Sequence, residues 1–77
     1  MLAALGRLRE ATEEYRRVLA ADPGSSRAWF GLAASLEGTC LTRDAAQAYR
    51  RFLSGWSRQD ERRAQAEARL RSLGGAP

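Results

Sequence analysis

The sequence predicts an all-α protein of about four helices, organised as a helix-turn-helix solenoid. One observation behind this prediction is an internal repeat, because EYRRVL at residues 14–19 returns as AYRRFL at residues 48–53. The same 34-residue step pairs Arg9 with Arg43. The other observation is that apolar residues recur at steps of three and four, the spacing of one helix face. A period of about 34 residues is typical of solenoids, in which each unit buries its apolar stripe against its neighbours.

The first helix is predicted over residues 8–21, and proline ends it. Asp22-Pro23 stops the helix because proline lacks a backbone donor and disfavours the helical conformation in the residue before it. The apolar stripe of this helix consists of Leu8, Ala11, Thr12, Tyr15, Val18 and Leu19.

Two further helices follow after short turns. The second is predicted over residues 26–37, with Ser25 or Ser26 as its N-cap and Gly38-Thr39 as its end. Thr42 is predicted to cap the third, which reaches about Leu53 and carries Asp44 near its positive end. The expected buried positions are Ala28, Trp29, Leu32, Ala33 and Leu36 in the second helix and Ala45, Ala48, Tyr49 and Phe52 in the third.

The fourth helix is predicted to start at Ser57 or Asp60 and to run to about Leu73, where Gly74-Gly75 ends it. Its apolar line is thin, consisting of Ala66, Leu70 and Leu73, so it is expected to act as a lid with a solvated outer face. Arg63 and Glu67 lie four residues apart and are expected to pair. Trp56, in the preceding break, either fills the gap between the third and fourth helices or stays partly exposed for a partner.

In type and spacing, this pattern resembles the tetratricopeptide repeat (TPR). The resemblance implies a right-handed superhelix, with small residues such as Ala33 and Ala45 where helices approach closely. The turn at residues 38–41 and Ser57, which stands where a closing proline is expected, depart from the pattern. The matching residues are Ala11, Tyr15, Val18, Asp22 and Pro23, then Trp29, Leu32, Ala33 and Leu36, and then Ala45, Tyr49 and Phe52.

The repeat divides the chain into three parts. Residues 1–23 form an incomplete first repeat, mainly its second helix; residues 24–57 form a complete repeat; residues 58–77 form a C-terminal capping helix and tail. Residues 1–5 would be only the last turn of a missing partner helix. Two interpretations stay open: a C-terminal piece of a longer array or a gene with a late annotated start, or a short protein whose first helix is covered by another chain. In the second, the first helix extends upstream through Gly6 at a cost of about 1 kcal/mol.

The composition argues against catalysis and against metal or cofactor chemistry. The 77 residues contain no histidine and one cysteine, Cys40, so a histidine base, a Cys–His dyad, a disulfide and an ordinary zinc set are excluded. We therefore expect no enzyme activity, no cofactor and no metal. No apolar run approaches the roughly 20 residues that a membrane helix needs. No export signal is visible, which favours a cytoplasmic location, although a truncated N-terminus would leave the compartment open.

The resemblance to TPR implies a protein-protein interaction module that binds a peptide or a partner helix in a shallow concave groove. Phe30 is the expected aromatic anchor, because Gly31 and Ala34 beside it leave room for an inserted side chain. The alternative for Phe30 is packing on the lid helix. The resemblance places in the groove Arg27, Phe30, Gly31, Ala34 and Glu37, with Ala64, Gln65, Ala68 and Arg71 from the lid.

Two other functions remain open. A structural segment could assemble through the uncovered side of its first helix, and the candidate self-association face is Leu8, Ala11, Tyr15, Val18 and Leu19. The chain also has a formal net charge of +4, and all of its cationic residues are arginines. Arg16-Arg17 and Arg50-Arg51 could form a ridge that binds phosphate or acidic segments, or could pair locally with Glu13 and Glu14. Nucleic acid is not favoured, because no aromatic is interleaved with them to stack on bases.

Overall fold

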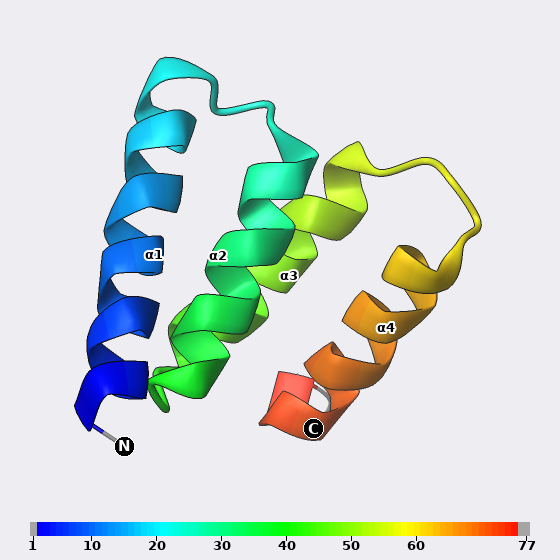
Figure 1. Cartoon of the computed structure of the whole chain (residues 1–77). Coiled ribbons are helices and arrows are strands. Elements are labelled where there is room, and N and C mark those ends of the chain that lie inside the picture. Colours follow the sequence, from blue (N-terminus) through cyan, green and yellow to red (C-terminus); the bar gives the residue numbers. More distant parts are fainter. Residues whose placement is uncertain (1, 76–77) are drawn as a thin grey trace.

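The protein is built of helices that follow one another with short connections (Figure 1). The computed structural model describes the backbone of residues 2–75 and the side chains of residues 6–73. Within this range the elements are α1 (Leu2–Ala21), α2 (Ser26–Gly38), α3 (Thr42–Gly55), α4 (Glu61–Leu70) and a terminal π-helical turn, η1 (Arg71–Gly75). The predicted all-α class with four helices is confirmed, and the described backbone contains no strand.

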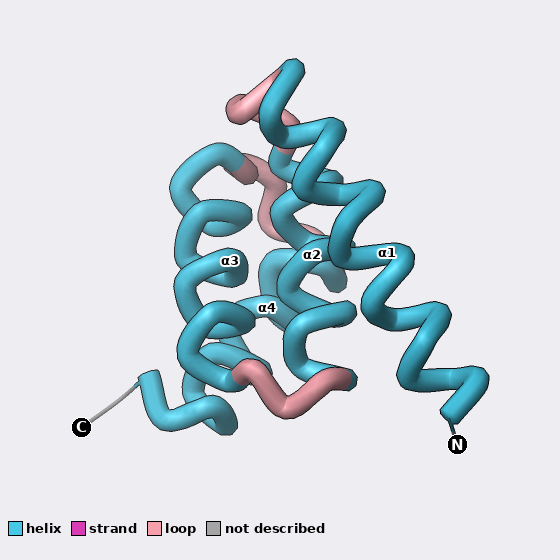
Figure 2. Tube along the Cα trace, turned by 90° about the vertical axis from the view of Figure 1, so that its left-hand side faces the viewer, coloured by secondary structure: helices cyan, strands magenta, loops and turns pink. Residues whose placement is uncertain are grey.

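Consecutive helices run antiparallel, and each packs on the next. Helix α1 lies against α2, α2 against α3, and α3 against α4 and η1 (Figures 1 and 2). This sequential packing is the arrangement expected of a solenoid, in which each helix pair contacts only its neighbours.

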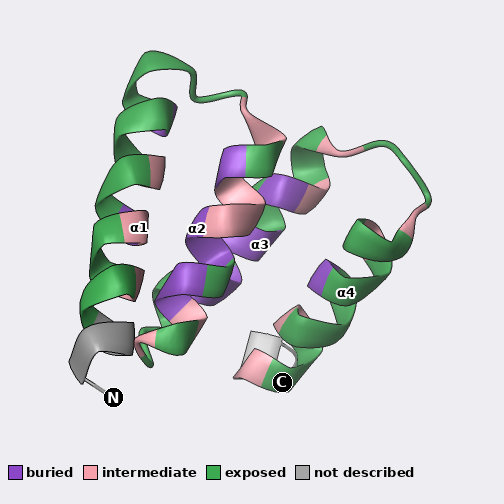
Figure 3. Ribbon diagram, in the orientation of Figure 1, coloured by how far each residue is buried: buried purple, intermediate pink, exposed green. Residues whose placement is uncertain are grey.

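The core lies between α2 and α3, as the burial pattern shows (Figure 3). Phe52 of α3 is fully buried, with 0% of its surface exposed, and Leu36 of α2 is almost so. Ala33 and Ala45 are also fully buried, which lets the helix backbones approach closely. The predicted buried stripes of both helices are therefore confirmed, except that Trp29 is only half-buried.

The contact between α1 and α2 depends on two glycines of α2. A Cβ atom built on Gly31 would lie 2.3 Å from Cζ of Tyr15, and one built on Gly38 would lie 2.7 Å from Cδ1 of Leu8. The two glycines are seven residues apart, as are Leu8 and Tyr15, so each pair lies on one line of its antiparallel helix. Two large side chains of α1 thus occupy two positions where α2 has no side chain.

Helix α1 begins earlier than the apolar spacing indicated. It starts at Leu2 and runs through Gly6 without a break. This agrees with the extension through Gly6, one of the two arrangements that the sequence left open, and contradicts a separate turn of a preceding helix at residues 2–5. Nothing lies within 4 Å of a Cβ atom built on Gly6, so this position of α1 has room for a side chain. Met1 lies outside the described residues, and so do the side chains of Leu2 and Leu5.

The turn between α2 and α3 explains why Thr42 is not a cap. Cys40 has φ of 64°, the left-handed conformation that usually selects glycine after a helix. The backbone N–H of Leu41 then donates to the carbonyl of Leu36 at 2.9 Å, which closes the turn. Leu41 becomes the N-cap of α3 without a side-chain hydrogen bond, and Thr42 is the first helical residue.

The other helix ends differ from the predicted ones by small shifts. Ser25 caps α2, as predicted, by accepting a hydrogen bond from Ala28 N–H. Helix α3 continues to Gly55 instead of Leu53. Asp60, one of the two predicted starts, caps α4. The α-helical part of α4 ends at Leu70, and the last predicted turn is the wider π-helical η1.

Glutamine at each of two helix glycines separates the effect of close packing from that of helix propensity. We expect Gly6→Gln to raise the free energy of unfolding by about 0.5–1 kcal/mol, because glycine inside an exposed helix is entropically costly. We expect Gly31→Gln to lower it by about 1–3 kcal/mol, because the new side chain must displace Tyr15 from α2. Urea unfolding followed by circular dichroism measures both. Equal shifts of the two variants in the same direction would contradict the seating of Tyr15 on Gly31.

Candidate peptide groove

Helices α2, α3 and α4 surround a shallow hollow of about 420 Å³. Three of the predicted groove residues meet here: Ala34 and Glu37 from α2, and Gln65 from α4. Sequence reasoning placed Tyr49 only in the core and did not single out Arg69, yet both line the hollow. The complete lining is Ala34, Glu37, Gly38, Tyr49, Gln65 and Arg69.

A carboxylate forms the polar centre of this hollow. Oε1 of Glu37 accepts a hydrogen bond from the Tyr49 hydroxyl at 2.9 Å. Its other oxygen, Oε2, lies against the guanidinium of Arg69 as an ion pair. The Glu37 side chain is 16% exposed and that of Arg69 is 48% exposed, so the carboxylate is the inner partner. Burial raises the pKa of the Tyr49 hydroxyl, so this hydroxyl stays protonated and remains a donor to Glu37.

This polar contact connects three helices. Glu37 comes from α2, Tyr49 from α3 and Arg69 from α4, and the ion pair joins two helices that lie on opposite sides of the hollow. Glu37 Oε2 is buried, and its partner among the described residues is Arg69. The hollow therefore holds an acceptor atom that a bound donor could use after Arg69 moves aside.

Phe30 does not serve as a free aromatic anchor in the groove. Its ring meets Phe52 edge-on, with ring centroids 4.9 Å apart, and lies 5.9 Å from Tyr49. Phe30 is half-buried and belongs to the core between α2 and α3. The expected open pocket beside it is also absent, since Tyr15 of α1 covers Gly31.

The remaining predicted groove residues do not meet at this hollow. Arg27 lies near the start of α2, and Ala64 and Ala68 lie on α4 and Arg71 on η1; all are exposed and none lines the hollow. Arg69 could have been found from its spacing, because it lies four residues after Gln65 and so shares its helix face. The contact of Arg69 with Glu37 is set by the angle between α2 and α4, which the sequence does not contain.

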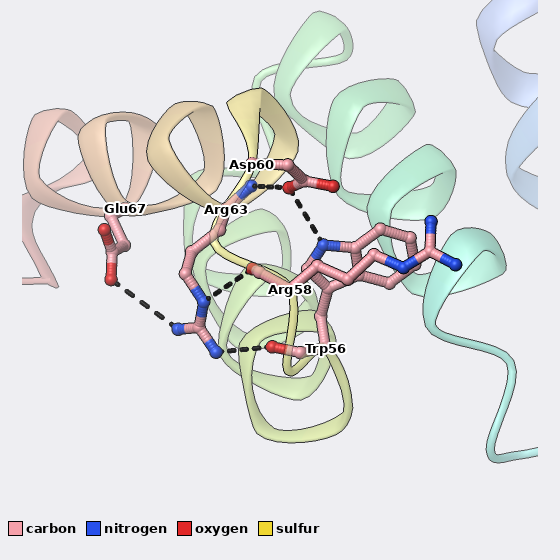
Figure 4. Close-up of polar contacts among 5 residues, drawn as sticks. All are labelled: Trp56, Arg58, Asp60, Arg63 and Glu67. Carbon is pink, nitrogen blue, oxygen red and sulfur yellow. Dashed lines mark hydrogen bonds and ion pairs between the residues drawn. The ribbon is translucent and has the colours of Figure 1, made fainter.

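The loop before α4 is organised around Trp56 (Figure 4). The indole ring of Trp56 stacks on Phe52, with centroids 5.1 Å apart. Its N–H donates to Oδ1 of Asp60 at 3.0 Å, and the same oxygen accepts the backbone N–H of Arg63 at 3.1 Å. Trp56 therefore fills the gap between α3 and α4, one of the two interpretations given by the sequence.

The Arg63 side chain also holds this loop in place through hydrogen bonds to its backbone. Its Nε–H donates to the carbonyl of Arg58 at 3.1 Å, and its Nη2 donates to the carbonyl of Trp56. The predicted ion pair with Glu67 is present at 3.7 Å. The guanidinium of Arg58 lies over the Trp56 ring, 5.6 Å from its centroid. Together these contacts fix the start of α4, and with it one wall of the hollow, relative to α3.

The candidate self-association face is largely used inside the chain. Leu8 and Tyr15 pack on the two glycines of α2, and Leu19 is buried. Ala11 is half-buried, whereas Val18 is 46% exposed. The expectation that this stripe stays uncovered is therefore corrected, because α2 covers most of it.

The arginines of the predicted ridge have different surroundings. Arg17 pairs with Glu14 at 3.5 Å, as the local-pairing interpretation states. Arg51 lies over the Trp29 ring, 5.6 Å from its centroid. Among the described residues, no three histidine, cysteine or acidic side chains come together as a metal site. In the same range, no helix has the length and apolar character needed to cross a membrane.

Comparison with known protein families shows what the first part of the chain is similar to. Residues 1–35 match the family model described as tetratricopeptide repeat. This segment is therefore similar to a tetratricopeptide repeat. The matched segment contains α1, the Asp22-Pro23 turn and α2 as far as Ser35. TPRs generally mediate protein-protein interaction and are generally not catalytic. Searches of curated proteins and of solved structures gave no match.

Acid should weaken the capping of α4 through Asp60. The hydrogen bond from Trp56, and next the one from the Arg63 backbone, lower the pKa of Asp60. A lowered pKa in the folded state gives stability that is complete above the unfolded value of 3.8 and is lost as the pH falls through the folded value. We expect Asp60→Asn to reduce the loss of stability between about pH 5 and about pH 2, since asparagine keeps a capping oxygen but does not titrate.

Urea unfolding at several pH values checks this expectation. Asp44→Asn is the matched control, because it removes one negative charge from the first turn of α3. If both variants lose stability with acid in the same way as the parent chain, Asp60 does not carry the effect.

Proposed function

We propose that this chain binds a peptide or a single helix of a partner protein in the hollow between α2 and α4, without catalysing a reaction. The observation that carries the proposal is the meeting of Ala34, Glu37 and Gln65, from two helices, around a space of about 420 Å³. Ligand sites of proteins commonly have volumes of about 300–1,000 Å³ and a few convergent polar groups. The general role of TPRs in protein-protein interaction supports the same function.

The lining suits the chemistry of a peptide. Ala34 is exposed and small, so a ligand side chain can approach the α2 backbone. The Gln65 amide can both donate to and accept from a peptide group. Glu37 is held by Tyr49, which leaves its orientation fixed for a donor such as a peptide N–H or a cationic side chain. Arg69, which is half-exposed, would move aside or pair with a carboxylate of the ligand.

A bulky residue at Ala34 should close the hollow without disturbing the fold. Random peptides displayed on phage are selected on the parent chain alone, and the selected peptides are then measured by fluorescence anisotropy. We expect Ala34→Arg to weaken their binding by at least about tenfold, which corresponds to about 1.4 kcal/mol. The loss is steric, because the arginine side chain occupies the space of the ligand.

Ala68→Arg is the matched control, because it adds the same side chain to an exposed alanine of α4 that does not line the hollow. It should bind the selected peptides like the parent chain, and both variants should keep the parent's circular dichroism melt. Peptides that bind Ala34→Arg as tightly as the parent chain would refute the hollow as the site.

We propose association of two copies through α1 as a second candidate function. Val18 of α1 is exposed, with 46% of its surface accessible. Val18 lies seven residues after the half-buried Ala11, so the two share one line of α1. An identical apolar patch can cover itself across a two-fold axis.

Sedimentation at several concentrations tests this association. We expect Val18→Glu to shift the parent chain toward the monomer, because a charge in an apolar contact is costly. Ala20→Glu, at an exposed position of the same helix, should leave the association unchanged. A parent chain that stays monomeric at high micromolar concentration would remove this second function.

A further inference from the structure

A second hollow, separate from the groove, lies on the outer side of the protein. It has a volume of about 570 Å³ and is formed by α3 together with Leu73 of η1. By helical spacing, the α3 residues that line this hollow lie on the face of α3 roughly opposite to its buried stripe. The lining consists of Arg43, Ala46, Gln47, Arg50, Arg51, Ser54 and Leu73.

The hollow is basic and has no internal counter-charge. Arg43, Arg50 and Arg51 line it, and no carboxylate does. The ion pairs among the described side chains engage Arg17, Arg63 and Arg69 instead. The formal net charge of the whole chain is also positive, at +4. A negatively charged partner is therefore favoured at this surface.

The apolar part of the lining further limits the kind of ligand that fits the hollow. Ala46 is buried and Leu73 is half-buried, so the arginines surround an apolar floor. Such a floor favours a ligand that brings an apolar side chain between its charges. No aromatic residue lines the hollow, and stacking of bases, which supports binding of single-stranded nucleic acid, is not provided.

The spacing of the arginines sets the spacing of the ligand's charges. Arg43 and Arg50 are seven residues apart on one helix face, a distance of about 10.5 Å along the axis at 1.5 Å per residue. In an extended peptide, at about 3.3 Å per residue, this distance separates residues about three positions apart. Arg51 is held over the Trp29 ring, which limits its conformations before a ligand arrives.

We infer that this hollow binds an acidic segment of a protein partner, in which carboxylates about three residues apart flank an apolar side chain. The carboxylates pair with Arg43 and Arg50, where guanidinium and carboxylate can form two parallel hydrogen bonds. The apolar side chain rests on Ala46 and Leu73. This site uses the side of α3 away from the groove, so a partner here does not compete with a peptide there.

The test uses the full chain and a fluorescein-labelled peptide with two glutamates three residues apart and a leucine between them. Fluorescence anisotropy gives the affinity in low and in moderate salt. We expect Arg43→Gln with Arg50→Gln to weaken binding by about tenfold or more. Arg7→Gln with Arg17→Gln, which removes the same charge from exposed positions of α1, should weaken it by no more than about twofold.

Two further probes separate the possible ligands. A peptide with serine in place of leucine should bind at least about threefold more weakly, since it loses the apolar contact with Leu73. Single-stranded oligothymidine should bind more weakly than the leucine peptide at moderate salt. If the two double variants lost the same affinity for the leucine peptide, the peptide would be attracted by net charge alone, and the proposed site would be refuted. Tighter binding of the oligonucleotide would overturn the protein partner in favour of nucleic acid.

Discussion

The packing of aromatic rings around Phe52 holds the fold together. Phe52 is fully buried in α3, receives the edge of Phe30 from α2, and stacks with Trp56 at the start of the loop to α4. Aromatic pairs of this geometry contribute about 0.5–1.5 kcal/mol each beyond their buried area. A single side chain thus connects α2, α3 and the loop that positions α4, and the width of the groove depends on it.

Polar contacts also hold α4 against α2 and α3. Asp60 takes the indole N–H of Trp56 with the same oxygen that caps α4, so the position of the ring and the start of the helix are set together. Glu37 and Arg69 then connect the far part of α4 to α2. Helix α4 has few buried residues of its own, with Ala66 as the buried one, and these contacts compensate for its small apolar face.

Much of the fold follows from the sequence, because the residues that decide it act locally or through helical spacing. The alanines at residues 33, 45 and 48 indicate where two helices approach closely. Pro23 and Asp60 indicate helix ends, because proline and capping residues act within one helical turn. The continuous α1 through Gly6 is one of two arrangements that the sequence left open, and the left-handed conformation of Cys40 was not predicted. The groove was predicted only in part. Helical spacing places Ala34, Glu37 and Gln65 on the faces that line the groove. Tyr15 covers Gly31, and Phe30 packs on Phe52. These two contacts depend on the angles at which the helices cross, which the sequence does not show.

The seating of α1 on the two glycines of α2 has a consequence for motion. Helix α1 packs mainly on α2, whereas α2 and α3 share the aromatic core. On separation, Leu8 and Tyr15 of α1 would lose their contacts at the two glycine positions of α2, and Leu19 would leave the core cluster. Detachment of α1 would break its interface with α2 but would leave the contacts of Phe52 with Phe30 and Trp56 in place. Such a local opening has a smaller free energy than global unfolding. We therefore expect the amide protons of α1 to exchange faster than those of α3. During such openings, the two glycine positions of α2 would be exposed to another helix that carries large side chains seven residues apart.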